Sequence, residues 1–196
     1  MTVETPFPFL NYLRLGEIKR LVHRFNDQVN QHQAKAVSIT SLQPGEGRTF
    51  LVAVLAIGQA LFLKKKVLVI DASSQPEKGH LYLNRIFEDE LLGKCVDLIS
   101  PKNKTASSED TADFELRELI ESYKRKYDLI LLDTTAIESS NTTSMDPMIV
   151  SKAAEHTLMI LSNPSISSGN FKHVKKDFES WGIHLLGTVY NFGSLK

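Results

Sequence analysis

Cysteine is almost absent from this 196-residue chain, whose only cysteine is Cys95. One cysteine excludes an internal disulfide bond and a cysteine-based zinc site. Small secreted proteins commonly rely on disulfides, whereas proteins of the reducing cytoplasm do not. We therefore expect a cytoplasmic protein.

The chain also lacks a secretory signal and a long apolar run. Residues 1–6 contain no basic segment followed by a continuous apolar stretch, which a signal peptide requires. The longest apolar run covers residues 51–63 and is broken by Gly58 and Gln59. Because a bilayer span needs about 20 apolar residues, we expect this run to be a buried helix.

An excess of either charge is missing as well. The 23 Lys and Arg residues balance the 23 Asp and Glu residues, so the formal net charge is zero. This balance argues against nucleic acid as a partner. Hydrophobic residues make up 42% of the chain, enough for a packed core. The length suits one compact domain, which we assign to residues 36–196, after an N-terminal segment and helix in residues 1–35.

Short apolar runs alternate with helical patterns along the chain. The runs are mostly continuous, which is typical of strands covered on both faces. The expected strands cover residues 36–40, 67–71, 96–99, 129–133, 157–162 and 185–191. The expected helices cover residues 12–31, 48–63, 77–87, 112–126, 145–154 and 168–181. This alternation predicts an α/β fold with a doubly wound, mainly parallel sheet. Two polar segments, residues 101–110 and 134–144, are expected to be loops, and the second directly follows a strand, where ligands of such sheets bind.

The most informative segment joins the first expected strand to the helix that begins near Arg48. Its sequence, SLQPGEGRT over residues 41–49, is similar to a phosphate-binding loop. In such a loop, backbone N–H groups and the positive end of the helix face a phosphate, and a hydroxyl such as that of Thr49 binds Mg²⁺. The usual motif is G-x-x-x-x-G-K-[ST], and here Leu42 replaces the first Gly and Arg48 replaces the Lys. A tight strand-to-helix turn without a ligand is the alternative.

Several further segments carry a family resemblance. The segment PGEG at residues 44–47 and the strand and acidic motif VLVIDASSQP at residues 67–76 match in order. So do YDLILLDT at 127–134, SMD at 144–146 and GTVYN at 187–191. Together they resemble the bacterial tyrosine kinases (BY-kinases) of capsule and exopolysaccharide systems, within the MinD/ParA branch of P-loop ATPases. The resemblance covers about residues 12–193 and implies that fold.

The resemblance also implies site residues. Phosphates of ATP or ADP would lie against Gly45, Glu46, Gly47, Arg48 and Thr49. Mg²⁺ would be held by Thr49, Asp71 and Asp133, directly or through water. The catalytic groups would be Asp71 and Asp133, with a weak contribution from Arg48, and Asn191 would contact the adenine. For the two aspartates, strand-end polarity or helix capping is the alternative; for Asn191 it is a turn role.

The chain departs from the family pattern in its charged residues. Arg48 replaces a Lys, Ser73 an Asp, Gln75 an Arg, and Thr135 a Pro. A guanidinium is planar and larger than an ammonium and needs a different path to the same phosphate oxygens. The family's C-terminal tyrosine cluster is missing, and the five tyrosines are dispersed. We expect weak or lost binding of Mg-ATP or Mg-ADP and little phosphotransfer.

The N-terminal helix resembles the family's subunit-contact helix, whose pattern is E-x-x-R-x-x-R. Glu17 and Arg20 match it, and His23 stands at the last Arg. The resemblance implies a homo-oligomer formed through this helix. The alternative is an amphipathic helix that packs its apolar residues on its own core.

Three functions remain open at this point. The first is a degenerate BY-kinase-like protein, a pseudokinase, that regulates exopolysaccharide or capsule synthesis or export at the inner face of the membrane. Its partner would be a membrane polysaccharide co-polymerase or adaptor protein. The second is an active Mg-ATP-dependent tyrosine kinase or ATPase of the same system. The third is a MinD/ParA-like positioning ATPase. The chain has Gln43 where that branch has an extra loop lysine, which argues against this function.

Overall fold

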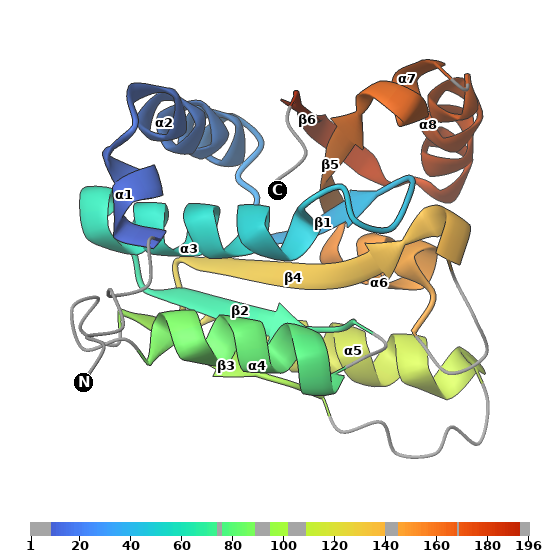
Figure 1. The fold of residues 1–196 in the computed structure, drawn as a ribbon. Coiled ribbons are helices and arrows are strands. Elements are labelled where there is room, and N and C mark those ends of the chain that lie inside the picture. The colour runs from blue at the N-terminus through green and yellow to red at the C-terminus, as the bar shows by residue number, and fades with distance from the viewer. Residues whose placement is uncertain are drawn as a thin grey trace.

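The computed structural model describes residues 9–73, 76–88, 95–101, 109–139, 145–167 and 169–192. Its centre is one sheet of six parallel strands in the order β3-β2-β4-β1-β5-β6. The strands are β1 (Ala36–Ser41), β2 (Val67–Asp71), β3 (Val96–Ile99), β4 (Leu129–Ala136), β5 (His156–Ser162) and β6 (His184–Asn191). The predicted parallel α/β sheet is thus confirmed (Figure 1).

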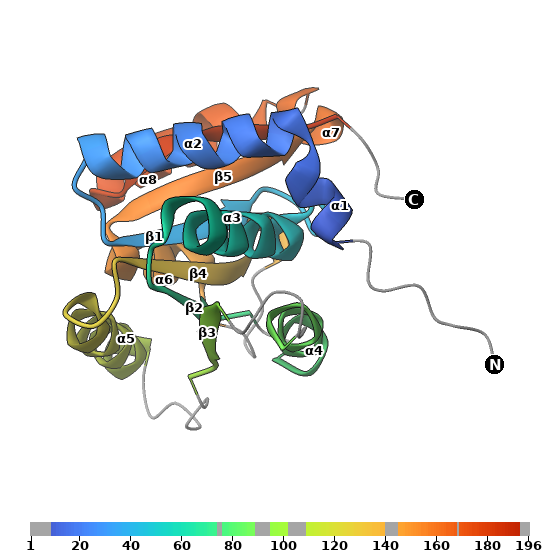
Figure 2. The same ribbon diagram turned by 90° about the vertical axis from the view of Figure 1, so that its left-hand side faces the viewer.

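Helices cover both faces of this sheet. They are α1 (Phe9–Arg14), α2 (Gly16–Gln31), α3 (Arg48–Leu63), α4 (Pro76–Phe87), α5 (Glu109–Lys124), α6 (Pro147–Ala154), α7 (Asn163–Ser167) and α8 (Asn170–Trp181). In Figure 2, α4 and α5 lie on opposite sides of β2 and β3. Helices α3 and α4 pack on one face, and α5, α6 and α8 on the other.

Helix α3 is buried because it lies between the sheet and α2. All residues from Leu51 to Ala60 are buried, which explains the continuous apolar run in the sequence. Helix α2 crosses its outer side closely: the Nε2 atom of Gln59 donates a hydrogen bond to the carbonyl oxygen of Val22, at 3.0 Å. Val22 itself is fully buried and lies over Gly58. The small Gly58 therefore sets how near the two helices come.

Helix α2 packs its apolar side on the core, as the amphipathic alternative predicted. Phe25 is buried, and Ile18 and Leu21 pack partly buried against the same cluster. Glu17 and Arg20 are exposed. The subunit contact through these two charged residues stays a prediction.

Several element boundaries differ from the predictions. The expected helix 12–31 is two helices, α1 and α2, because Leu15 between them has an extended backbone. Helix α6 begins at Pro147, where the carboxylate of Asp146 accepts a hydrogen bond from the N–H of Met148, at 2.7 Å. Asp146 is thus a helix cap. Helix α7 was not predicted from the sequence.

Parts of both expected loops are regular structure. Residues 134–136 continue β4, because the Thr134 hydroxyl donates to the carbonyl of Ile39 (3.0 Å) and Ala136 pairs with Ser41 on β1. A short 3₁₀ helix, Ile137–Ser139, follows. Residues 109–110 begin α5. The remaining loop residues 102–108 and 140–144, with Gln75 and Ser144 of the motifs, lie outside the described residues.

Within the described residues, no helix is both long enough and apolar enough to cross a bilayer.

Candidate functional site

The loop between β1 and α3 has the backbone geometry of a phosphate cradle. Gly45 and Gly47 have φ values of 81° and 97°, a left-handed conformation that residues with a Cβ adopt at a cost. Gly47 caps α3 directly, so the unpaired N–H groups of the first helical turn face the loop. A Cβ on Gly45 would meet no atom within 4 Å. Open space therefore lies over the loop at this glycine.

Leu42 occupies the position where the usual motif has its first glycine. Its side chain is fully buried. It packs in a cluster with Met159, Leu161 and Phe178, under β5 and α8. The leucine thus belongs to the core beneath the loop, and its backbone lies outside the left-handed region that would require glycine.

The Glu46 side chain ties the loop to β5 and α7. Its Oε1 atom accepts hydrogen bonds from the N–H and hydroxyl of Ser162, at 2.8 and 2.6 Å, and from the hydroxyl of Ser165, at 2.5 Å. Its Oε2 atom accepts from the N–H of Gln43, at 3.0 Å. Burial alone would raise the pKa of Glu46, but these hydrogen bonds outweigh it and lower the pKa. The carboxylate holds the loop's shape, a role the sequence motif did not reveal.

Asn191, the last residue of β6, contacts the same loop. Its Nδ2 atom donates a hydrogen bond to the carbonyl oxygen of Glu46, at 3.0 Å. A Cβ on Gly47 would lie 3.4 Å from this atom. The asparagine predicted to contact adenine is thus beside the phosphate loop, at the same edge of the sheet, and its adenine contact stays a prediction.

The two predicted acidic residues lie next to each other. Asp71 ends β2 and Asp133 lies in β4, and they are paired in the parallel register of these strands. Both are buried. The Asp71 Oδ1 atom accepts hydrogen bonds from the N–H and hydroxyl of Ser73, at 3.0 and 2.6 Å. Ser73 therefore binds Asp71 through both its backbone and its side chain.

Asp133 is the most perturbed acid at this edge. Within the described residues, neither of its carboxylate oxygens has a hydrogen-bond partner. Burial raises its pKa to about 7, against the opposing effects of the Thr49 hydroxyl and the Arg48 guanidinium, while the charge of Asp71 adds to the rise. Thr49 is thus close enough to act on Asp133 without a hydrogen bond of ordinary geometry. A buried carboxylate whose oxygens accept no hydrogen bond is costly unless a cation binds it, so Asp133 is a candidate metal ligand.

Arg48 directs its guanidinium toward the end of β4. Its Nη1 atom donates a hydrogen bond to the carbonyl oxygen of Thr134, at 2.9 Å. Burial lowers the pKa of Arg48, and the charges of Asp133 and Glu46 oppose this. The Arg48 guanidinium is thus bound to the protein itself, close to Asp133, the carboxylate that would bind Mg²⁺.

The residues at this edge fit a magnesium nucleotide. Carboxylate and hydroxyl oxygens are the donors that Mg²⁺ prefers, and it keeps several waters and phosphate oxygens in its shell. Asp71, Asp133 and Thr49 supply such donors. In the part of the chain that the structure describes, no three His, Cys, Asp or Glu side chains could share one metal ion, so phosphates and water would complete the shell.

Comparisons with known proteins agree with this geometry. No protein-family model matches the chain. It is 23% identical over 185 residues to the tyrosine-protein kinase CpsD of Streptococcus pneumoniae, covering 85% of this chain and 79% of CpsD. The kinase domain of the Escherichia coli tyrosine kinase ETK superimposes with a TM-score of 0.67 at 20% identity, over 88% of this chain and 74% of that domain. The chain has the fold of a bacterial tyrosine kinase domain.

The kinase fold extends to the MinD/ParA ATPases. The MinD cell division protein of Aquifex aeolicus superimposes with a TM-score of 0.54 at 24% identity, over 81% of this chain and 69% of MinD. The P-loop fold and the resemblance to BY-kinases predicted from the motifs are confirmed. The structure places the predicted site residues of β2, β4 and the β1–α3 loop at one edge of the sheet, where ligands of such sheets bind. Their roles stay a prediction.

Proposed function

We propose that this chain is a degenerate member of the BY-kinase family that regulates capsule or exopolysaccharide synthesis or export. It binds ATP or ADP with Mg²⁺ weakly and transfers little phosphate. The resemblance in sequence and fold supports the family, and the geometry of Arg48 supports the degeneracy. In such a protein the loop between β1 and α3 would still bind phosphate but would no longer support phosphoryl transfer.

The hydrogen bond from Arg48 to the Thr134 carbonyl carries the proposal. Phosphoryl transfer depends on cations placed against the β- and γ-phosphates. A lysine at this position delivers a mobile point charge, whereas the Arg48 guanidinium is held by Thr134 and the field of Asp133. A phosphate that needs this charge must first break the hydrogen bond, which weakens binding.

Ser73 adds to the loss of catalytic power. In the family pattern an aspartate at this place supplies a second negative charge beside Asp71. Here a neutral hydroxyl donates to Asp71 instead, so the site has one charge fewer with which to position a metal ion. Catalysis of this kind is mostly electrostatic positioning, and the nucleotide is therefore bound without efficient transfer.

The proposal includes a membrane partner. By the family resemblance, this partner is a polysaccharide co-polymerase or adaptor at the inner face of the membrane, and nucleotide binding sets the chain's state when it docks. Self-assembly would use the exposed Glu17 and Arg20 of α2. A protein that has lost catalysis acts by such contacts.

Calorimetric titration with ADP and Mg²⁺ tests the nucleotide proposal. We expect weak binding by the wild type and binding about tenfold tighter by Arg48→Lys, equal to about 1.4 kcal/mol, because lysine releases the Thr134 contact. The matched control is Arg117→Lys, an exposed residue on α5, which should leave binding unchanged. Tight wild-type binding that Arg48→Lys does not improve contradicts the proposed role of Arg48. Silence of both proteins means that the chain is an interaction module without a nucleotide.

The active-kinase alternative is favoured by one observation, the adjacent Asp71 and Asp133 beside Thr49. Incubation with labelled ATP and Mg²⁺ and detection of phosphotyrosine decide between the two functions. We expect no robust labelling of the chain alone. Strong labelling that Asp133→Asn abolishes would establish an active kinase in place of the degenerate one.

A further inference from the structure

Basic residues gather at the amino edge of the sheet, opposite the phosphate loop. The turns before β2, β4 and β1 contain them, and these strands are neighbours in the sheet. The residues are Lys64, Lys65 and Lys66 before β2, Arg125 and Lys126 before β4, and Lys35 before β1. All but Lys65 are exposed. The chain has zero net charge, so its positive charge is unevenly distributed over the surface.

Hydrogen bonds between the turns hold the basic residues in one array. The N–H of Asp128 donates to the carbonyl of Lys66 (2.9 Å), and the N–H of Lys66 donates to the Asp128 carboxylate (2.8 Å). The N–H of Ile130 donates to the carbonyl of Lys35, at 2.8 Å. The Lys35 Nζ atom donates to the carbonyl of Lys124, at 3.2 Å. The backbone of the turns that carry these residues is therefore held together.

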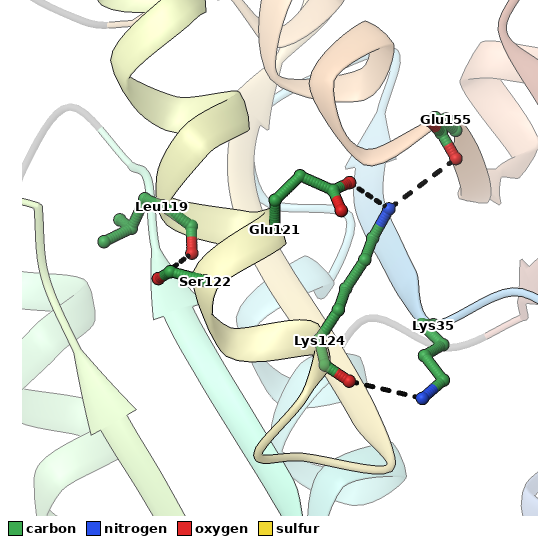
Figure 3. A network of polar contacts seen from close by, with 6 residues as sticks. All are labelled: Lys35, Leu119, Glu121, Ser122, Lys124 and Glu155. Carbon is green, nitrogen blue, oxygen red and sulfur yellow. Dashed lines mark hydrogen bonds and ion pairs between the residues drawn. The ribbon is translucent and has the colours of Figure 1, made fainter.

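Nearby acids compensate only part of this positive charge. Lys124 is already paired, with Glu121 at 2.6 Å and Glu155 at 3.8 Å (Figure 3), so we leave it and these two acids out of the array. Asp128 lies in the turn before β4, and Asp97 lies in β3 beside β2. Asp97 accepts a hydrogen bond from the Tyr127 hydroxyl, at 2.7 Å. Counted with Lys124, seven basic side chains stand among four acidic ones in the described residues of this edge, so an excess of positive charge remains. Six of the basic residues are Lys35, Lys64, Lys65, Lys66, Arg125 and Lys126. We call these six residues the basic edge.

Aromatic side chains lie at the same edge. The Nζ atoms of Lys66 and Lys126 lie 4.8 and 5.5 Å from the ring centres of Tyr127 and Tyr123. Trp181, which ends α8 just before β6, is 46% exposed. Its ring lies 5.4 Å from the Lys152 Nζ atom. Tryptophan and tyrosine rings are enriched at membrane–water interfaces, where they lie at the level of the headgroups.

We propose that the basic edge binds the anionic surface of a phospholipid bilayer directly. The cations stand on three neighbouring turns, about 10 Å across at a strand spacing of about 4.8 Å, and five of the six residues are exposed. A plane of negative lipid headgroups matches such an array, and the exposed Trp181 suits the interface. In this orientation the phosphate loop, at the opposite edge, faces away from the membrane. The contact needs no protein partner, so it goes beyond the proposed function.

Vesicle co-sedimentation tests this contact. We expect the full chain to bind vesicles of phosphatidylcholine with phosphatidylglycerol and not vesicles of phosphatidylcholine alone. Binding should disappear in 1 M salt, where the screening length falls to about 3 Å. The variant Lys64→Glu/Arg125→Glu/Lys126→Glu should lose about a hundredfold or more in partitioning, since each basic residue near such a surface contributes about 1 kcal/mol.

A matched control separates the basic edge from net charge. Lys172→Glu/Lys175→Glu/Lys176→Glu reverses three exposed lysines of α8 and should keep most of the binding. Circular dichroism of both variants checks folding, and neutral Gln substitutions at the same edge positions should give an intermediate loss. Trp181 is the only tryptophan, so its fluorescence should shift to the blue on binding anionic vesicles.

Three results would overturn the proposal. The first is no binding of the wild type to anionic vesicles, and the second is equal loss in both triple variants. The third is tighter binding, at the same salt, of a duplex DNA or an acidic peptide than of vesicles, which would assign the basic edge to a soluble polyanion. Because the vesicles contain no protein, failure here leaves the nucleotide titration and its outcome untouched.

Discussion

Asp71 and Asp133 are paired residues of neighbouring parallel strands, and the structure thereby brings two buried carboxyl groups to one edge of the sheet. Sixty-one residues of chain lie between them, yet β2 and β4 place them side by side. The same edge holds Arg48 and the start of α3. The stability of this edge therefore depends on which of these side chains are charged.

Removing the Asp133 charge should stabilise the fold above neutral pH. The folded-state pKa is raised from 3.8 to about 7, so the folded protein keeps a proton that the unfolded chain releases over that window. Stability therefore falls as pH rises from about 4 to about 7 and stays reduced above it. We expect Asp133→Asn to gain about 2–4 kcal/mol over wild type at pH 8 relative to pH 4, measured by urea denaturation.

Asp177→Asn, at an exposed position of α8, is the control for that comparison and should show no such gain. Added Mg²⁺ at pH 8 should stabilise the wild type more than Asp133→Asn, because the ion neutralises the same carboxylate. Parallel pH profiles for wild type and Asp133→Asn would disprove the raised pKa.

Glu46→Gln should loosen the phosphate loop. The carboxylate accepts hydrogen bonds from Gln43, Ser162 and Ser165, and an amide replaces one accepting oxygen with a donor. We expect a loss of about 1.5–3 kcal/mol, typical of a hydrogen-bonded charged group, in thermal or urea unfolding. Glu179→Gln, exposed on α8, should cost little.

The same carboxylate predicts an acid sensitivity. The folded-state pKa of Glu46 is lowered from 4.5, so its contribution is complete above that pH and is lost as pH falls through the folded pKa. The difference in stability between wild type and Glu46→Gln should therefore shrink below about pH 4.5. A constant difference across this range would assign the effect to packing alone.

A cluster of three histidines at the amino edge predicts a third pH effect. His156 lies with its ring centre 6.1 Å from that of His32 and 5.6 Å from that of His184. Burial lowers the pKa of His156, and His184, His32 and Lys124 lower it further, while Glu155 opposes them. As pH falls, the unfolded chain therefore binds a proton at His156 at a higher pH than the folded protein does. The free energy of unfolding thus falls as pH drops below about 6.5.

His156→Gln should flatten that dependence, measured as the change in urea midpoint between about pH 8 and about pH 5.5. His173→Gln, on the exposed side of α8, should keep the wild-type profile. If both variants behave alike, the cluster is not the cause.

Gly58→Ala should push α2 away from α3. A Cβ on Gly58 would lie 2.5 Å from the Val22 Cγ2 atom, well inside contact distance. We expect a loss of about 1–3 kcal/mol from overpacking, whereas Gly16→Ala, whose nearest atom is 4.0 Å away, should be neutral or slightly stabilising. In the double variant with Val22→Ala the two losses should be less than additive, and full additivity would contradict the contact.

The sequence by itself determined the parallel α/β fold, the glycine loop after β1 and the strands that carry Asp71 and Asp133. Continuous apolar runs such as residues 67–71 and 129–133 specify strands buried on both faces, and Gly45 and Gly47 specify a left-handed loop, because these are local properties of the chain. The ordered motifs were enough to expect the kinase fold. The run ending at Asp133 also placed this acid on a strand, although β4 continues to Ala136 and Asp133 is not its last residue.

Only the tertiary structure decided what the side chains of that loop contact. The bonds of Glu46 to Ser162 and Ser165 span more than 100 residues, and no local pattern specifies such partners. The direction of Arg48 depends on a carbonyl of β4, which lies near only because β1 and β4 are neighbours in the sheet. The basic edge arises in the same way: parallel strands all begin at one edge, so basic turns far apart in sequence meet there. Sequence motifs specify local geometry. Which charged side chains lie near one another depends on the order of the strands, and only the packed sheet establishes that order.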